Sequence, residues 1–216
     1  MRKVALVDLD STIFDTKKFR EECFVFLEQF VPPRVVRRAY EEAKKGGFFD
    51  ADLYHWHLDL FVSVAMATRI DTESLVKDWL SKVGMEKFLF PDTELFLRLL
   101  AQHGYEVHIL TLGTEWFQKA KIEGAGLLEL LSGYTVTRYP KVSAILTICN
   151  PAVDDVLFFD DHLGTIDSVK QAFPKIFSVQ VLRYDEQEEK RSALADSVVN
   201  NLEEAMGTLL AHQKPL

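Results

Sequence analysis

Four short apolar runs, separated by stretches with helical periodicity, set the strongest constraint on how this chain can fold. The runs are Lys3–Val7, Glu106–Leu112, Val156–Phe159 and Phe177–Tyr184. The first run is apolar and rich in β-branched residues, which is typical of a central strand buried on both faces. Strands that alternate with helices predict an α/β fold with a Rossmann-like, doubly wound and mostly parallel sheet.

Helical patterns lie between these predicted strands. The segment Asp92–His103 carries apolar residues at helical spacing, and Pro91 with Asp92 gives a start signal. A shorter helix is predicted over Lys141–Cys149. A longer helix is predicted over Leu194–Leu210, and we expect it to pack back on the sheet.

One region, from about Lys17 to Phe90, breaks the alternation because every periodic segment in it has a helical pattern. The four segments are Phe19–Phe30, Arg34–Lys45, Leu53–Thr68 and Glu73–Val83. Together they are too long for a crossover connection, and short amphipathic helices in series favour a small bundle. We therefore expect an α/β core made of residues 1–16 and 91–216, with residues 17–90 inserted as a helical cap.

Composition and charge narrow the class of protein. The chain has 216 residues, of which 48% are hydrophobic and 27% charged, an ordinary globular composition. Its net charge of −8 argues against a non-specific nucleic-acid binder, which normally carries a basic face. No apolar run approaches the roughly 20 residues that cross a bilayer. The first residues lead directly into a predicted strand, so we expect no signal peptide.

The cysteines give one further indication of the compartment. Cys23 and Cys149 each lie in an apolar stretch, which favours two buried, reduced thiols over a disulfide. We expect a cytoplasmic protein without nucleic-acid or membrane partners. The sequence does not indicate an oligomeric state.

Polar side chains follow three of the predicted strands, at the edge where open α/β sheets place ligand sites. Asp8 and Asp10 end the first strand, and residues two apart on an extended chain point to the same side. Two adjacent carboxylates repel one another unless a cation lies between them or one is protonated. An Asp-x-Asp turn is common at strand ends, so this pair alone is weak evidence for a site.

A second cluster, Thr111–Thr114, ends the next predicted strand and leads into a helix that begins at Glu115. Hydroxyls and helix-start amides at such a turn can hold a phosphate. Thr114 would equally fit a helix N-cap, which needs no ligand. This cluster is therefore also weak evidence when taken alone.

The third cluster is Asp160-Asp161, which directly follows Val156–Phe159, with Asp167 a little further on. Two acids beside a buried strand are costly unless a metal ion or a cationic group compensates their charge. The same requirement for a cation therefore arises at two of the three strand ends.

Taken together and in this order, the three clusters resemble motifs of the haloacid dehalogenase superfamily of phosphohydrolases. The family's first motif, an apolar strand followed by Asp-x-Asp-x-Thr, is matched by Val4–Thr12. Its second motif, a strand ending in Thr or Ser, is matched at Thr111. Its fourth motif, a strand ending in paired acids, is matched at Asp160-Asp161. The resemblance covers nearly the whole chain.

The third family motif is a lysine at or just before a helix. Lys141 fits best because it directly precedes an apolar helix, whereas Lys119 and Lys121 are alternatives that could reach inward from the preceding helix. Substitution of either alternative is expected to have little effect. The family often carries an acid four residues after the metal-binding Asp of the fourth motif. Here that position is Thr165, and the nearest acid is Asp167.

The resemblance implies a magnesium-dependent phosphatase that acts on a small phosphorylated metabolite. Asp8 would attack phosphorus to form an aspartyl-phosphate, and Asp10 would act as general acid and base. The Mg2+ ligands would be the Asp8 carboxylate, the Asp10 main-chain carbonyl and Asp161.

The remaining motif residues receive supporting roles from the same resemblance. Phosphate would be bound by Lys141 and by the Thr111 hydroxyl with the amides of Leu112 and Gly113. Asp160 would orient the site, and Asp167 is a further supporting acid.

Two other functions stay open at this point. A phosphomutase of the same superfamily would return the phosphoryl group from Asp8 to the substrate. A non-catalytic phosphate- or partner-binding relative would not need the acid/base residue Asp10. The same residue argues against the dehalogenase branch, which cleaves carbon–halogen bonds without an acid at this position.

Overall fold

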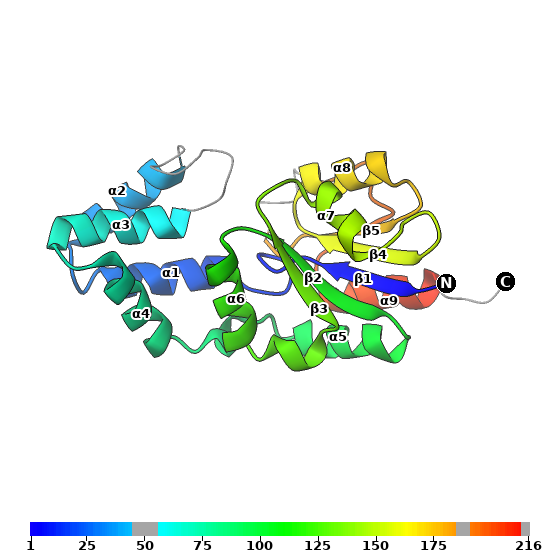
Figure 1. Ribbon diagram of the computed structural model, residues 1–216, viewed down its shortest axis with the longest axis horizontal. Helices are drawn as coiled ribbons and strands as arrows, with labels where there is room; N and C mark the ends of the chain where they lie inside the picture. The colour runs from blue at the N-terminus through cyan, green and yellow to red at the C-terminus, as the bar shows by residue number, and fades with distance from the viewer. Residues whose placement is uncertain (45–55, 185–190, 213–216) are drawn as a thin grey trace.

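The centre of the molecule is a six-stranded sheet with the order β3-β2-β1-β4-β5-β6 (Figure 1). The computed structural model describes residues 1–44, 56–184 and 191–212. Its strands are β1 Lys3–Val7, β2 Glu106–Leu112, β3 Gly133–Thr137, β4 Asp155–Asp160, β5 Phe177–Val181 and β6 Ser197–Val199. Each neighbouring pair is parallel. The predicted α/β, Rossmann-like class is therefore confirmed.

Helices cover both faces of this sheet. On one face lie α5 (Thr93–Gln102), α6 (Glu115–Gly124) and α9 (Leu202–His212), and on the other lie α7 (Lys141–Ile148) and α8 (Leu163–Ala172). Two short 3-10 helices, η1 (Met85–Phe88) and η2 (Leu127–Leu130), precede α5 and β3.

The pleat of β1 explains why its sequence shows no polar alternation. Val4 and Leu6 belong to the apolar cluster under α7 and α8, whereas Ala5 and Val7 belong to the cluster under α5 and α9. Successive side chains of a strand point to opposite faces, so a strand covered on both faces is apolar at every position. β1 thus holds the first motif at the middle of the sheet.

The chain departs from the sequence prediction at two places. The strand β3 was not predicted, because its Gly133–Thr137 segment lies at the sheet edge and is only half-buried. The helix predicted over Leu194–Leu210 is wrong at its start, which forms β6. β-branched valines favour the strand, and the side-chain oxygen of Asn201 accepts the main-chain N–H of Glu204 at 2.8 Å, which begins α9.

In the described part of the chain between β1 and η1, four helices lie together beyond one end of the sheet (Figure 1). They are α1 Thr16–Leu27, α2 Pro33–Lys44, α3 Trp56–Thr68 and α4 Thr72–Lys82. Each overlaps a predicted helical segment, although Lys45 and residues 53–55 of those segments lie outside the described residues. The larger apolar cluster continues from the sheet into these helices, since it includes Val7, Phe19, Leu60 and Trp79.

The cysteines and the helix lengths bear on two expectations from composition. Cys23 and Cys149 are buried free thiols, as predicted. Among the helices of the described ranges, none has the length and apolar character needed to cross a membrane.

Candidate active site

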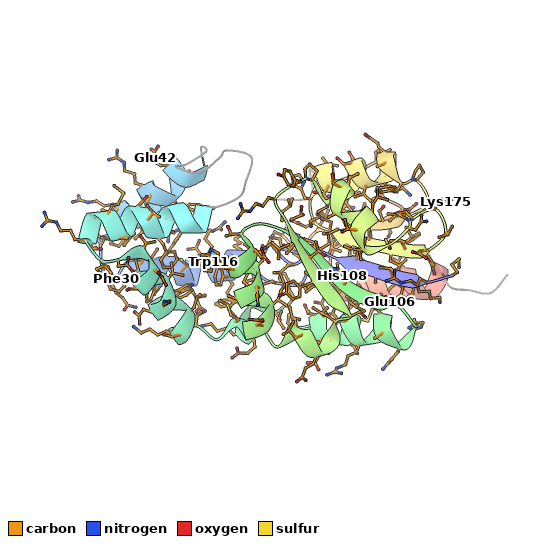
Figure 2. All side chains as sticks on the ribbon, in the orientation of Figure 1. Phe30, Glu42, Glu106, His108, Trp116 and Lys175 are labelled. Atoms are coloured by element: carbon orange, nitrogen blue, oxygen red, sulfur yellow. The ribbon has the colours of Figure 1, made fainter. Side chains whose placement is uncertain are left out.

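The polar clusters meet at the carboxyl end of the sheet, on the side of helices α1–α4. In Figure 2, Glu106 at the start of β2 and Trp116 beyond its end lie at opposite ends of the strand, with Trp116 nearer those helices. β1 pairs with both β2 and β4. The residues that end these three strands, Asp8, Thr111 and Asp160, therefore lie at one edge although they are far apart in sequence.

Asp8 and Asp160 share one ammonium group. Lys141, the first residue of α7, contacts the Asp8 carboxylate, and its Nζ lies 2.6 Å from Oδ2 of Asp160. The other Asp160 oxygen accepts the main-chain N–H of His162 at 2.8 Å. The hydroxyl of Thr12 lies 3.4 Å from Oδ2 of Asp8. The lysine preferred from sequence is thus the one that reaches Asp8.

Negative charge exceeds positive charge in this cluster. The carboxylates of Asp8, Asp160 and Asp161 each offer an oxygen within 4.8 Å of the others. Burial raises the pKa of Asp8 to about 7, against the lowering effect of the Lys141 ammonium. Burial, with repulsion from Asp160 and Asp8, also raises the pKa of Asp161. Burial opposes the charge of Lys141, but attraction by Asp160 and Asp8 outweighs it and raises the lysine's pKa.

This donor set fits a divalent cation. Closely spaced carboxylate oxygens are the ligands that Mg2+ prefers in proteins. A cation among the three would favour the ionised forms of Asp8 and Asp161, which burial disfavours.

Asp10 has a separate set of partners, which come from α1 and α6. Its Oδ1 accepts hydrogen bonds from Lys121 Nζ and Thr16 Oγ1, both at 2.7 Å. Its Oδ2 accepts one from Gln118 Nε2, also at 2.7 Å. Burial acts to raise the pKa of Asp10, but the Lys121 ammonium and these hydrogen bonds hold it below its usual range. Within the described chain, the Asp10 carboxylate is not part of the three-carboxylate group.

A tight turn after β1 brings Thr16 to Asp10. Ser11 has a φ of 60°, in the left-handed region that non-glycine residues rarely occupy. Its N–H donates to the carbonyl of Phe14 at 2.8 Å and lies 3.1 Å from Thr16 Oγ1. The N–H of Phe14 in turn donates to the carbonyl of Leu9 at 2.9 Å. Backbone strain of this kind is often found at functional sites.

The loop after β2 packs on the same glutamine. Gln118 Nε2 donates to Thr111 Oγ1 at 2.8 Å and lies 3.0 Å from the carbonyl of Leu112. Gly113 has a φ of 145°, and a Cβ there would lie 3.1 Å from Cγ of Gln118. The loop therefore needs glycine both for its conformation and for its close approach to α6.

Asp167 lies apart from the three-carboxylate group. It is on α8, where its Oδ1 accepts a hydrogen bond from the hydroxyl of Ser192. The structure thus places this predicted supporting acid in a contact with the segment that precedes β6.

Sequence reasoning gave no role to Gln118 and treated Lys121 only as an alternative third motif. Both are buried on α6, with 2% and 3% of their surface exposed. The signal that could have found them is the spacing of Thr114, Gln118 and Lys121, which places three polar residues on one helix face. By contrast Lys119 is half-exposed and pairs with Glu123 at 3.7 Å.

By sequence, no model of a known protein family and no curated protein matches the chain. By structure, a haloacid dehalogenase-like hydrolase of Burkholderia xenovorans LB400 is 19% identical over 99% of both chains, with a TM-score of 0.79. The HAD-hydrolase YfnB of Bacillus subtilis, bound to magnesium, is 15% identical over 97% of this chain and 99% of its own, with a TM-score of 0.65.

A third similar structure carries a covalent adduct. The L-2-haloacid dehalogenase of Xanthobacter autotrophicus, with chloropropionic acid covalently bound, is 17% identical over 99% of this chain and 100% of its own, with a TM-score of 0.63. At these identities the likeness concerns the fold. The chain therefore has the fold of the haloacid dehalogenase-like hydrolases, as its strand-end motifs predicted.

Proposed function

We propose that the protein is a magnesium-dependent phosphatase that hydrolyses a small phosphorylated metabolite through an aspartyl-phosphate on Asp8. The observation that supports this most is that Asp8 and Asp10, two residues apart, have different surroundings. Asp8 lies with Lys141 and the carboxylate group, whereas Asp10 lies outside that group with hydrogen-bond donors of its own. Phosphoryl transfer needs a nucleophile close to positive charge and a separate proton donor.

In the first step an Asp8 oxygen attacks phosphorus, and the bond from phosphorus to the leaving oxygen breaks. Asp10 donates a proton to that oxygen, so the product leaves as an alcohol. Lys141 places a compact positive charge beside the attacked phosphoryl group and Asp8. The Thr111 hydroxyl and the amides of Leu112 and Gly113 would hold the phosphoryl oxygens.

In the second step water attacks the same phosphorus atom. Asp10, now ionised, takes the proton from the water, and the bond between phosphorus and Asp8 breaks to release phosphate. The Asp8 and Asp161 carboxylates and the Asp10 main-chain carbonyl would hold Mg2+, which would supply positive charge to the phosphoryl oxygens. Asp160 keeps Lys141 in place through its 2.6 Å contact.

The same proposal gives a role to the segment 17–90, which includes most of α1 and all of α2–α4. We propose that this segment is a cap domain that selects the substrate. Its helices lie at the carboxyl end of the sheet, where the candidate site is. If this segment is replaced by a short glycine-serine linker, we expect a folded core with weak activity on an aryl phosphate and no discrimination among metabolites. Circular dichroism and a metabolite panel measure both properties. An unfolded truncation would instead assign the helices to the core.

Phosphatase activity is distinguished from dehalogenation by the product released. We expect phosphate from p-nitrophenyl phosphate with Mg2+, and no chloride from 2-chloropropionate. Activity should be lost after dialysis against EDTA and return with Mg2+, because the carboxylates of Asp8, Asp160 and Asp161 need a counter-charge. Full activity without a divalent cation would exclude the metal, and chloride release would exclude the phosphatase assignment.

A further inference from the structure

We propose that Lys121 and Gln118 are positioning residues that fix the orientation of the Asp10 carboxylate for proton transfer to the leaving group. The inference rests on the proposed function, in which Asp10 is the general acid. It assigns a task to the polar face of α6, which the chemistry at Asp8 does not use.

The ammonium group of Lys121 is held between the Asp10 carboxylate and three aromatic rings. Its ammonium lies 2.7 Å from Asp10 Oδ1 and 5.1–5.3 Å from the ring centres of Phe14, Phe19 and Phe117. These rings come from the turn after β1, from α1 and from α6, so the ammonium is surrounded by three separate elements. A cation over aromatic faces is attracted to them, which restricts its movement further.

Gln118 holds the second oxygen of the same carboxylate. Its Nε2 is within 3.0 Å of three acceptors, Asp10 Oδ2, Thr111 Oγ1 and the Leu112 carbonyl, although an amide carries only two hydrogens. Its Oε1 is buried and has no hydrogen-bond partner among the described residues. A buried amide oxygen without a partner costs stability, so packing alone does not explain a glutamine at this position. The contacts of Gln118 link Asp10 to the loop proposed to bind phosphate.

The donors leave one side of Asp10 accessible. Its side chain is 30% exposed, whereas that of Lys121 is 4% exposed. Asp10 can therefore meet a substrate while Lys121 and Gln118 hold it from the protein interior. Because neither donor needs to touch the substrate, each acts through Asp10. Misplacement of a reacting group by about 1 Å can cost on the order of 10²-fold in rate.

The test uses two substrates that differ in their need for a proton. We compare kcat/KM, which reports the steps up to leaving-group release, for an alkyl phosphate and for p-nitrophenyl phosphate. The sequence alone predicted little effect from replacing Lys121, but its contact with Asp10 changes that expectation. Lys121→Met should lower the value for the alkyl ester by roughly tenfold or more, part of the 10²–10⁴-fold that general acid catalysis supplies. The value for the aryl ester should change by less than about threefold, because its leaving group needs little protonation. Gln118→Leu, which leaves no buried charge unpaired, should show the same selectivity.

Two controls separate positioning from folding. Lys119→Met changes a half-exposed lysine on the same helix and should leave both values unchanged. In an Asp10→Asn background, Lys121→Met should cause no further loss on the alkyl ester, since there is no proton donor left to position. Equal losses on both esters, or a further loss in that background, would overturn the inference. If the wild type released phosphate from neither ester, the proposed function would fail first and the inference with it.

Discussion

Two buried lysines come from helices on opposite faces of the sheet, and their surroundings differ. Lys141, at the first residue of α7, contacts the carboxylates of Asp8 and Asp160. Lys121, in the last turn of α6, contacts the carboxylate of Asp10 and three aromatic rings. Both are almost fully buried, so their difference comes from the partners that each ammonium meets.

The different partners of the two ammonium groups suit them to different roles. Lys141 lies among three carboxylates, so under the proposed function its positive charge is placed to stabilise a phosphoryl group beside Asp8. Lys121 has one nearby carboxylate and a ring environment that fixes it, so it is suited to hold Asp10. Burial of a lysine therefore does not by itself identify the catalytic one.

The largest expected effect separates the two aspartates. Asp8→Asn removes the nucleophile, so turnover and the covalent adduct should both be lost. Asp10→Asn keeps the main-chain carbonyl but loses the proton shuttle, worth roughly 10²–10⁴-fold, together with the ion pair to Lys121. With p-nitrophenyl phosphate, rapid quench and intact-protein mass spectrometry should show a phosphorylated Asp10→Asn protein. An adduct on Asp8→Asn would show that the roles are assigned wrongly.

Lys141→Ala should have the next largest effect. We expect a loss of ~10²-fold or more, the scale seen when one preorganised charge stabiliser is removed. Unlike Lys121→Met, it should slow the aryl and alkyl esters alike, because charge on the phosphoryl group is stabilised whatever the leaving group. Steady-state kinetics on both esters measures this. A loss confined to the alkyl ester would show that Lys141, like Lys121, acts on leaving-group protonation and not on the charge of the phosphoryl group.

A third buried ion pair, outside the carboxylate cluster, tests how much such a pair contributes to stability. Arg183 makes a two-pronged contact with Asp92 at 2.7 and 2.9 Å, and its Nε donates to the carbonyl of Thr12 at 2.9 Å. Breaking a buried pair by removing one partner costs about 3–5 kcal/mol. Arg183→Met should therefore lower the free energy of unfolding by about 3 kcal/mol in urea denaturation.

The smallest effect is expected at the matched surface pair. Arg98→Met removes an exposed contact with Glu94 on α5, which should change the free energy of unfolding by less than about 0.5 kcal/mol. A loss at Arg98 as large as that at Arg183 would mean that burial does not set the contribution of ion pairs in this protein.

The sequence predicted the parts of the site that follow directly from strands. Asp8 and Asp160 end apolar runs that have no polar alternation, and Lys141 directly precedes an apolar helix, so their places depend on local pattern. Gln118 and Lys121 could not be placed in this way. The direction in which their helix face points is decided by packing of α6 against Phe14 and Phe19, residues that lie about a hundred positions earlier.

The same distinction explains the errors in the fold. Strand β3 is an edge strand with half-buried residues, and its segment Gly133–Thr137 lacks the continuous apolar run of the central strands. Strand β6 has only three residues, Ser197–Val199, and it exists because β5 offers it an edge. Short strands at sheet edges depend on their neighbours more than on their own residues.

The central place of β1 has a consequence for the synthesis of the chain. β1 is made first, but its two neighbours in the sheet are β2 and β4, which are made much later. At a synthesis rate of about 5–20 residues per second, the run Lys3–Val7 spends on the order of ten seconds without its β4 partner. An apolar strand with two unpaired edges can pair with other chains during that interval. The residues that position Asp8 are thus also a segment that can aggregate before β2 and β4 have been made.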